Sequence, residues 1–268
     1  MTDNNPTSPV IVGIDGSDTA IYAAQWAVDE AVDRGVPLRL VYVAKATHLG
    51  SEKYYEDIHH GNAALAKAHA EVEASGKPVR IETTILEGRP GTTLVAASWD
   101  AGLICVGSVG IGRYAQSILG STATELAEGA HCPVAIIRPQ SGAHRKDINW
   151  IVVAAKPQPG NDAVVEQAMK EAGLRHAPVL LLGDRESAHG EVDRLEREMD
   201  EWKRRYPDVH IYPIANSADV AHFLKKHDER VQLAVIGSAD ADELAEIVGP
   251  TGHPVFHHTD SSALVVRS

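Results

Sequence analysis

Short apolar runs alternate with longer helix-forming stretches along the whole chain. The first run, residues 9–15, ends in turn-forming residues, and residues 20–34 then place alanines along one face of a helix. Continuous apolar strands that alternate with helices are typical of a parallel sheet covered by helices on both faces. Such sheets bind ligands beyond the carboxyl ends of their strands. The alternation therefore predicts an α/β fold with a site near Asp15, Val43 and Gly107, which follow or end apolar runs.

The pattern occurs twice. In the first half we expect strands at residues 9–15, 38–43, 79–86, 103–106 and 134–137, and helices at 20–34, 62–75, 91–100 and 119–129. The second half repeats it, with strands at 150–154, 178–182, 209–214, 233–238 and 263–267 and helices at 161–172 and 191–206. A repeat of roughly 130 residues is much longer than a solenoid repeat. We therefore expect two tandem domains, 1–140 and 150–268, joined by a polar linker at 141–149.

Charge and composition exclude several classes of protein. The net charge is −12, from 25 basic and 37 acidic residues, which disfavours a broad nucleic-acid surface. The sequence has no run of about 18 apolar residues, the length needed to cross a membrane. Residues 1–9 lack the features of a secretory signal. Only Cys105 and Cys132 occur, so a disulfide framework is not expected. These features predict a cytoplasmic protein with no membrane or nucleic-acid partner.

A glycine-rich segment, residues 107–122 (GSVGIGRYAQSILGST), carries the most specific chemical signal. Gly107 would end a strand where backbone approaches a ligand, and Gly110 and Gly112 would permit positive φ angles. Ser121 and Thr122 would begin a helix, whose free N–H groups and dipole favour phosphate. From residue types alone, a plain turn followed by an ordinary helix cap explains the segment equally well.

The spacing of Gly107, Gly110 and Gly120-Ser121 resembles the ATP-binding signature of the universal stress protein family, two glycines separated by two residues and then, nine residues on, Gly-Ser or Gly-Thr. Residues 12–17 (VGIDGS), 40–43 (LVYV) and 131–138 (HCPVAIIR) are similar to flanking elements of that family. The resemblance extends over both halves and is closest to the tandem members of mycobacteria and related actinobacteria. It implies that each domain is an open five-stranded parallel sheet with helices on both faces.

The resemblance also implies a binding role for seven residues of the first domain. Asp15 would bind the ribose or neighbouring polar groups, and Val43 would meet the adenine. Gly107 and Gly110 would line the path of the ribose and phosphates. Gly120, Ser121 and Thr122 would hold the phosphates. The implied ligand is ATP, expected with Mg²⁺, although cyclic AMP stays open.

Two positions of the first domain depart from the family pattern. Val109 stands where many members have a basic residue, which Arg113 could replace, and Ala123 stands where some have a hydroxyl. The second domain departs further. Ala154-Ala-Lys-Pro157 offers no acid, Asp240 replaces the second glycine, and Pro250 removes an N–H from residues 249–252. We therefore expect a degenerate second domain without a nucleotide site.

The resemblance points to a regulator in the stress or dormancy response that binds a nucleotide, with no catalytic residues. A slow ATPase or nucleotidyl enzyme and a nucleotide-free structural protein remain alternatives. The fourteen histidines, including His59-His60 and the group at 253–258, lack the cysteine or carboxylate spacing of a zinc site, so we expect no metal site within the protein.

Assembly is predicted from the expected fifth strands. Residues 134–137 and 263–266 are apolar and would need to be covered. The two halves would pair as an internal pseudo-dimer, and pairing of two chains stays open.

Overall fold

The central strands of each sheet are built from buried apolar residues and lie in parallel, as continuous apolar runs predict. The computed structural model describes residues 8–45, 51–110, 119–139, 149–184, 192–216, 218–227, 229–248 and 261–267. Contacts divide the chain into two compact units, Met1–Arg138 (unit 1) and Pro139–Ser268 (unit 2). The predicted linker at 141–149 lies, apart from Asn149, outside the described residues.

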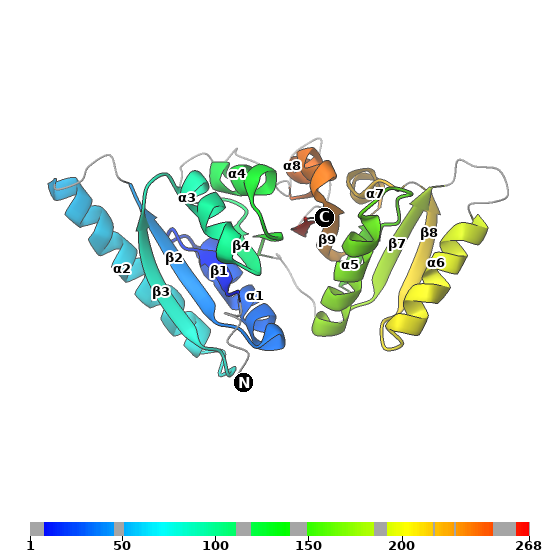
Figure 1. Ribbon diagram of the computed structural model, residues 1–268, viewed down its shortest axis with the longest axis horizontal. Helices are drawn as coiled ribbons and strands as arrows, with labels where there is room; N and C mark the ends of the chain where they lie inside the picture. Colours follow the sequence, from blue (N-terminus) through cyan, green and yellow to red (C-terminus); the bar gives the residue numbers. More distant parts are fainter. Residues whose placement is uncertain are drawn as a thin grey trace, which may run out of the picture. The chain divides into compact units, whose positions relative to one another are not determined.

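Unit 1 contains a parallel sheet of strand order β3-β2-β1-β4-β5. Its strands are β1 (Val10–Gly13), β2 (Leu38–Ala44), β3 (Ile81–Glu87), β4 (Leu103–Gly107) and β5 (Val134–Ile137). Its helices are α1 (Asp18–Arg34), α2 (Glu52–Glu73), α3 (Pro90–Ala97) and α4 (Ser121–Gly129), with a 3-10 turn, η2 (Ser98–Asp100), after α3. Helix α1 packs beside α2, and α3 packs beside α4 (Figure 1). The strand order reverses between β1 and β4, which is where a doubly wound sheet opens a crevice.

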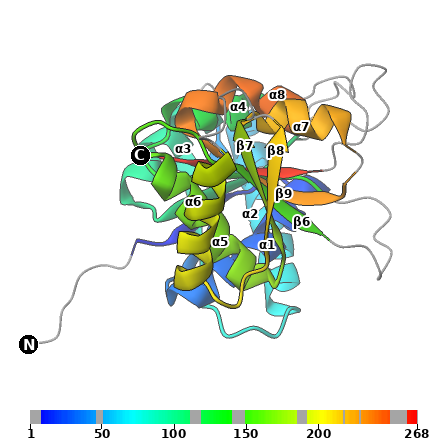
Figure 2. The same ribbon diagram turned by 90° about the vertical axis from the view of Figure 1, so that its right-hand side faces the viewer.

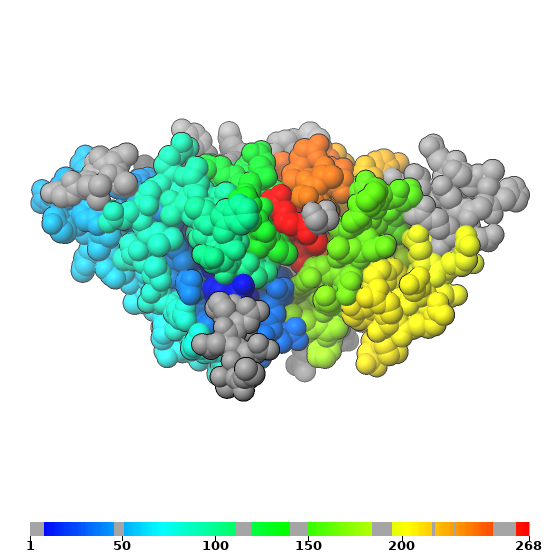
Figure 3. Space-filling model, in the orientation of Figure 1, coloured from blue at the N-terminus to red at the C-terminus, as the bar shows by residue number. Residues whose placement is uncertain are grey.

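Unit 2 repeats this topology, with strand order β10-β9-β6-β7-β8. Its strands are β6 (Trp150–Ala154), β7 (Val179–Asp184), β8 (Ile211–Asn216), β9 (Val231–Gly237) and β10 (Ser262–Val266). Its helices are α5 (Asn161–Arg175), α6 (Val192–Arg205), α7 (Val220–Lys226) and α8 (Leu244–Ile247), with η3 (Ser238–Glu243) before α8. Helices α7 and α8 pack together (Figure 2), and α6 lies on the surface of its unit (yellow in Figure 3).

Helices α1 and α5 reveal the duplication in detail. Buried Glu30 pairs with Arg34 at 3.1 Å, and buried Glu171 pairs with Arg175 at 2.9 Å. The residue after each helix adopts the left-handed conformation, with φ of 63° at Gly35 and 49° at His176. The same buried ion pair and the same helix end therefore recur in both units.

The expected α/β fold class is confirmed, and the differences concern the ends of elements and the short helices α7 and α8 of unit 2. Helix α2 begins at Glu52 rather than at residue 62, because Ser51 caps it by accepting a hydrogen bond from the Tyr54 N–H. The sequence reasoning also missed α7, which Asp219 caps by accepting from the His222 N–H. The first turns of α2 contain few apolar residues, and α7 spans only seven residues, so neither shows a clear helical period.

Candidate functional site

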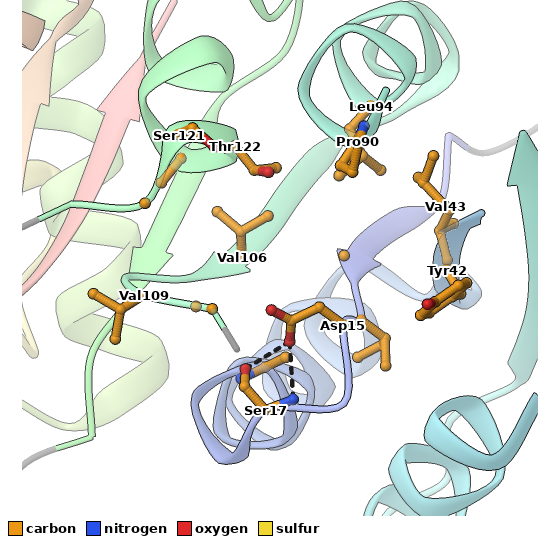
Figure 4. A pocket seen from close by; sticks show the side chains of 18 of the residues that line it. Asp15, Ser17, Tyr42, Val43, Pro90, Leu94, Val106, Val109, Ser121 and Thr122 are labelled. Atoms are coloured by element: carbon orange, nitrogen blue, oxygen red, sulfur yellow. Dashed lines mark hydrogen bonds between the residues drawn. The ribbon is translucent and has the colours of Figure 1, made fainter. Parts of the chain in front are cut away.

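A cavity of about 810 Å³ lies in unit 1 at the carboxyl ends of β1, β2 and β4. All seven predicted residues line it: Asp15, Val43, Gly107, Gly110, Gly120, Ser121 and Thr122. Figure 4 shows Asp15 near the middle, with Ser121 and Thr122 toward one end and Tyr42 and Val43 toward the other. The fold thus brings together residues from four separate parts of the chain.

Asp15 is oriented by the turn that begins α1. Its Oδ1 accepts two hydrogen bonds from Ser17, one from the backbone N–H at 2.9 Å and one from the hydroxyl at 2.6 Å (Figure 4). The Ser17 hydroxyl also caps α1 by accepting from the Ala20 N–H at 3.2 Å. The cap that starts the helix therefore also fixes the carboxylate.

Gly107 and Gly110 are required for space, not for a positive φ. A Cβ on Gly107 would lie 2.8–2.9 Å from three atoms of Thr19, and a Cβ on Gly110 would collide with Oδ2 of Asp15. Neither residue has a positive φ, so the predicted reason for glycine at position 110 was wrong. Gly112 and Arg113 lie outside the described residues.

The first turn of α4 closes the end of the cavity opposite Tyr42. The cavity is lined there by Gly120, Ser121, Thr122 and Ala123. The N-cap residue of this helix is Gly120, which has no side chain to cap it. An uncapped helix start offers backbone N–H groups and a positive dipole end to an anion.

The other end of the cavity contains a polar cluster that the sequence reasoning missed. Asp57 of α2 accepts a hydrogen bond from the Tyr42 hydroxyl at 2.6 Å and another from the Lys45 N–H at 2.8 Å. His60 meets the Tyr42 ring edge-on, with centroids 6.1 Å apart. Tyr42, Lys45, Asp57 and His60 all line the cavity. The expectation that Asp15 is the only acid of the site was therefore wrong.

Burial and Asp57 shift the ionisation of this cluster. Burial, followed by the hydrogen bond to Asp57, raises the pKa of the Tyr42 phenol above its ordinary value. Burial alone would raise the pKa of Asp57, but hydrogen bonds from Tyr42 and Lys45 outweigh it and hold the pKa below its usual value. Asp57 is therefore a carboxylate, and Tyr42 a neutral donor, at neutral pH.

Apolar side chains form the remaining wall. They come from the strand ends and from α3: Ile14, Val41, Val106, Pro90 and Leu94. Leu94 and Val106 are almost fully buried. A cavity with an apolar wall and a few convergent polar groups is typical of a small-molecule site.

No cluster of three or more histidine, cysteine or acidic residues suited to a metal occurs in the described part of the chain. The histidines at 253, 257 and 258 lie outside it. None of the described helices is long and apolar enough to span a bilayer.

The corresponding crevice of unit 2 has different chemistry. Strand β1 pairs Val12 with Cys105, and β6 pairs Val153 with Val235. Counting three residues beyond Val12 and Val153, and five beyond Cys105 and Val235, places Lys156 where unit 1 has Asp15 and Asp240 where it has Gly110.

These two residues of unit 2 bind each other. The Lys156 ammonium lies 2.7 Å from the Asp240 carboxylate, and both side chains are about four-fifths buried, with exposures of 20% and 18%. Residues 249–252, expected to depart from the phosphate signature, lie outside the described residues.

Comparison with known proteins places the chain in a family. The model of the universal stress protein family matches residues 7–138. Universal stress protein Rv2624c of Mycobacterium tuberculosis is 56% identical over 260 residues, covering 96% of each chain, and Rv2028c of the same organism is 35% identical, covering 99% of this chain and 98% of its own. The crystal structure of a universal stress protein from Archaeoglobus fulgidus has the same fold, with a TM-score of 0.73 over 97% of this chain and 96% of its own at 17% identity. The chain therefore belongs to the universal stress protein family, as a member of the tandem type.

Proposed function

We propose that unit 1 binds one adenine nucleotide, ATP with Mg²⁺, and that the protein acts as a nucleotide-dependent regulator in a stress or dormancy response. The observation that carries the proposal is the cavity. Its wall contains all seven residues that match the ATP-binding pattern of the family, and it has the size of a small-molecule site.

The two ends of the cavity differ in chemistry as a nucleotide requires. Val43, Val41 and Leu94 supply apolar surface for a base, while Asp15 near the middle can accept hydrogen bonds from ribose hydroxyls. The N–H groups at the start of α4, together with the Ser121 and Thr122 hydroxyls, suit phosphate oxygens.

Mg²⁺ fits this site as a companion of the phosphates. Mg²⁺ usually keeps several waters and takes one or two carboxylates besides substrate phosphates. Asp15 is the carboxylate beside the glycine segment, because the Cα of Gly110 faces its Oδ2. Both oxygens of Asp57 already accept hydrogen bonds.

A binding role fits better than rapid catalysis. Phosphoryl transfer needs an acid that holds the metal and a group that positions the nucleophile. Asp57 and His60 contact Tyr42 at the far end from α4, so neither is placed to activate water beside phosphates. A slow ATPase is the alternative that the presence of Asp15 leaves open.

Identification of bound and added nucleotides tests the proposal. Protein purified without added nucleotide is denatured, and the supernatant is analysed by mass spectrometry. The stripped protein is titrated with ATP, ADP, cyclic AMP and GTP, each with and without Mg²⁺. We expect ATP to bind more tightly than GTP. Tighter binding of cyclic AMP would reassign the ligand, and absence of binding to all four would refute the proposal.

A further inference from the structure

Thr19, in the first turn of α1, contacts the glycine segment from outside the cavity wall. Its hydroxyl donates a hydrogen bond to the carbonyl oxygen of Val109, 90 positions along the chain. Thr19 is the second residue of α1, so no earlier turn of its own helix offers it a carbonyl, and it bonds the loop that follows β4.

Thr19 also packs directly against Gly107. A Cβ on Gly107 would lie 2.8 Å from Oγ1, 2.9 Å from Cβ and 2.9 Å from the carbonyl carbon of Thr19. The backbone of residue 107 is therefore in van der Waals contact with Thr19, and the Thr19 side chain is hydrogen-bonded to residue 109. Two contacts fix the position of residues 107–110 relative to α1.

Thr19 also lies beside the residue that orients Asp15. Its Oγ1 is 3.0 Å from the Ser17 hydroxyl, but the Ser17 proton goes to Oδ1 of Asp15 and the Thr19 proton to the Val109 carbonyl, so neither is left for a hydrogen bond between the two hydroxyls. The hydroxyls therefore lie side by side, one bonded to the carboxylate proposed to bind ribose and the other to the carbonyl of Val109. At the other side of the segment, the Gly120 N–H donates to the Ser108 carbonyl at 2.8 Å, which ties it to the start of α4.

We propose that Thr19 is a positioning residue of the nucleotide site, which sets residues 107–110 at the right place between Asp15 and α4. This inference rests on the proposed function for its ligand, but the positioning itself belongs to the free protein. Without the hydroxyl, residues 107–110 lose one of their two contacts with α1, and the phosphate end of the site becomes less well aligned with the ribose end.

Three variants separate this role from a general effect on folding. Thr19→Val keeps the shape and removes the hydroxyl, and Thr19→Ser keeps the hydroxyl. Thr92→Val is the matched control, because exposed Thr92 also donates to a backbone carbonyl, that of Arg89 at 3.2 Å, outside the cavity wall.

The first measurement needs no ligand. Hydrogen exchange of the Gly120 amide, which donates to the Ser108 carbonyl, should be faster by about three- to tenfold in Thr19→Val, and unchanged in Thr19→Ser and Thr92→Val. Unchanged exchange in Thr19→Val, or an equal rise over all of unit 1, would overturn the positioning role.

The second measurement compares ligands by calorimetry. Thr19→Val should weaken ATP by about three- to tenfold, the range of one lost hydrogen bond, and adenosine less than twofold. Equal losses for ATP and adenosine would overturn the inference. If the wild-type protein bound neither, the proposed function would be wrong, while the exchange comparison would still decide the role of Thr19.

Discussion

At the scale of single residues, binding in the cavity depends on the space and the backbone N–H groups that certain positions leave accessible. Gly110 has no side chain where Asp15 projects, and Ser121 stands at a helix start that no side chain caps. Asp57 joins α2 to the end of β2 through two hydrogen bonds. Each position can be changed without touching the others.

Ser121→Ala should weaken ATP but not adenosine, because only the phosphates would contact the hydroxyl. Ser121 is exposed, so we expect a loss of about 1.5 kcal/mol, or roughly tenfold in Kd, at the low end for a hydrogen bond to a charged group. Calorimetric titration with both ligands measures this. Ser75→Ala, at an exposed serine beyond α2, is the control, and an equal loss for adenosine would show that the phosphate assignment is wrong.

Gly110→Ala and Gly173→Ala form a matched pair with opposite expected effects. The new methyl group at position 110 would displace the Asp15 carboxylate, so both adenosine and ATP should bind at least about tenfold more weakly. At position 173, in α5, nothing lies within 4 Å of the new methyl group, and alanine should stabilise the helix by up to about 1 kcal/mol. Titration and urea unfolding measure the two effects, and normal binding by Gly110→Ala would contradict the first.

Asp57→Asn should reduce stability in a pH-dependent way. The folded protein holds the pKa of Asp57 below its usual value, so this carboxylate stabilises the fold at pH values above about 4, the unfolded pKa. That contribution is lost as the pH falls through the folded pKa. The difference in unfolding free energy between wild type and Asp57→Asn should therefore be present at pH 6 and shrink below pH 4. A difference that is the same at both pH values would refute the assignment.

At the scale of elements, the same two loops are joined in both units by different chemistry. In unit 1 the loop after β4 is bonded to the first turn of α1 through Thr19, and Gly110 leaves room beside Asp15 in the loop after β1. In unit 2 the equivalent loops are held by the Lys156–Asp240 ion pair. We infer that this pair takes the space that unit 1 keeps for a ligand.

A double-mutant cycle on Lys156→Ala and Asp240→Ala tests the ion pair. Each single change leaves a mostly buried charge without its partner, so each should destabilise the protein. The double change should cost less free energy of unfolding than the sum of the two single changes. We expect a coupling energy of about 1–2 kcal/mol by urea unfolding. ATP affinity of unit 1 should stay the same. Additive losses would mean that the pair contributes nothing.

At the scale of the whole molecule, the two units share a topology but differ in the residues at the corresponding strand ends, where Lys156 and Asp240 pair in unit 2. Titration with ATP and Mg²⁺ should therefore give one nucleotide per chain. The variant Gly110→Ala should weaken that binding, while Asp240→Ala should leave the stoichiometry at one. Two nucleotides per wild-type chain would refute the prediction that unit 2 does not bind a nucleotide.

The sequence alone was enough to predict the fold class, and the resemblance to the universal stress protein family supplied the seven residues that line the cavity. Continuous apolar runs such as residues 103–106 favour a buried parallel sheet, and the spacing of the glycines carried the resemblance. Both are local properties of the chain. The duplication was likewise legible, because each unit repeats the same order of strands and helices.

Only the tertiary structure decided which side chains meet across the sheet. Asp57 reaches Tyr42 because α2 begins ten residues earlier than its apolar period indicates, and because Gly61 lets that helix lie close to the Tyr42 ring. Thr19 meets Val109, and Lys156 meets Asp240, over 90 and 84 positions of the chain. Such contacts depend on strand order, and no pattern local to either residue specifies them.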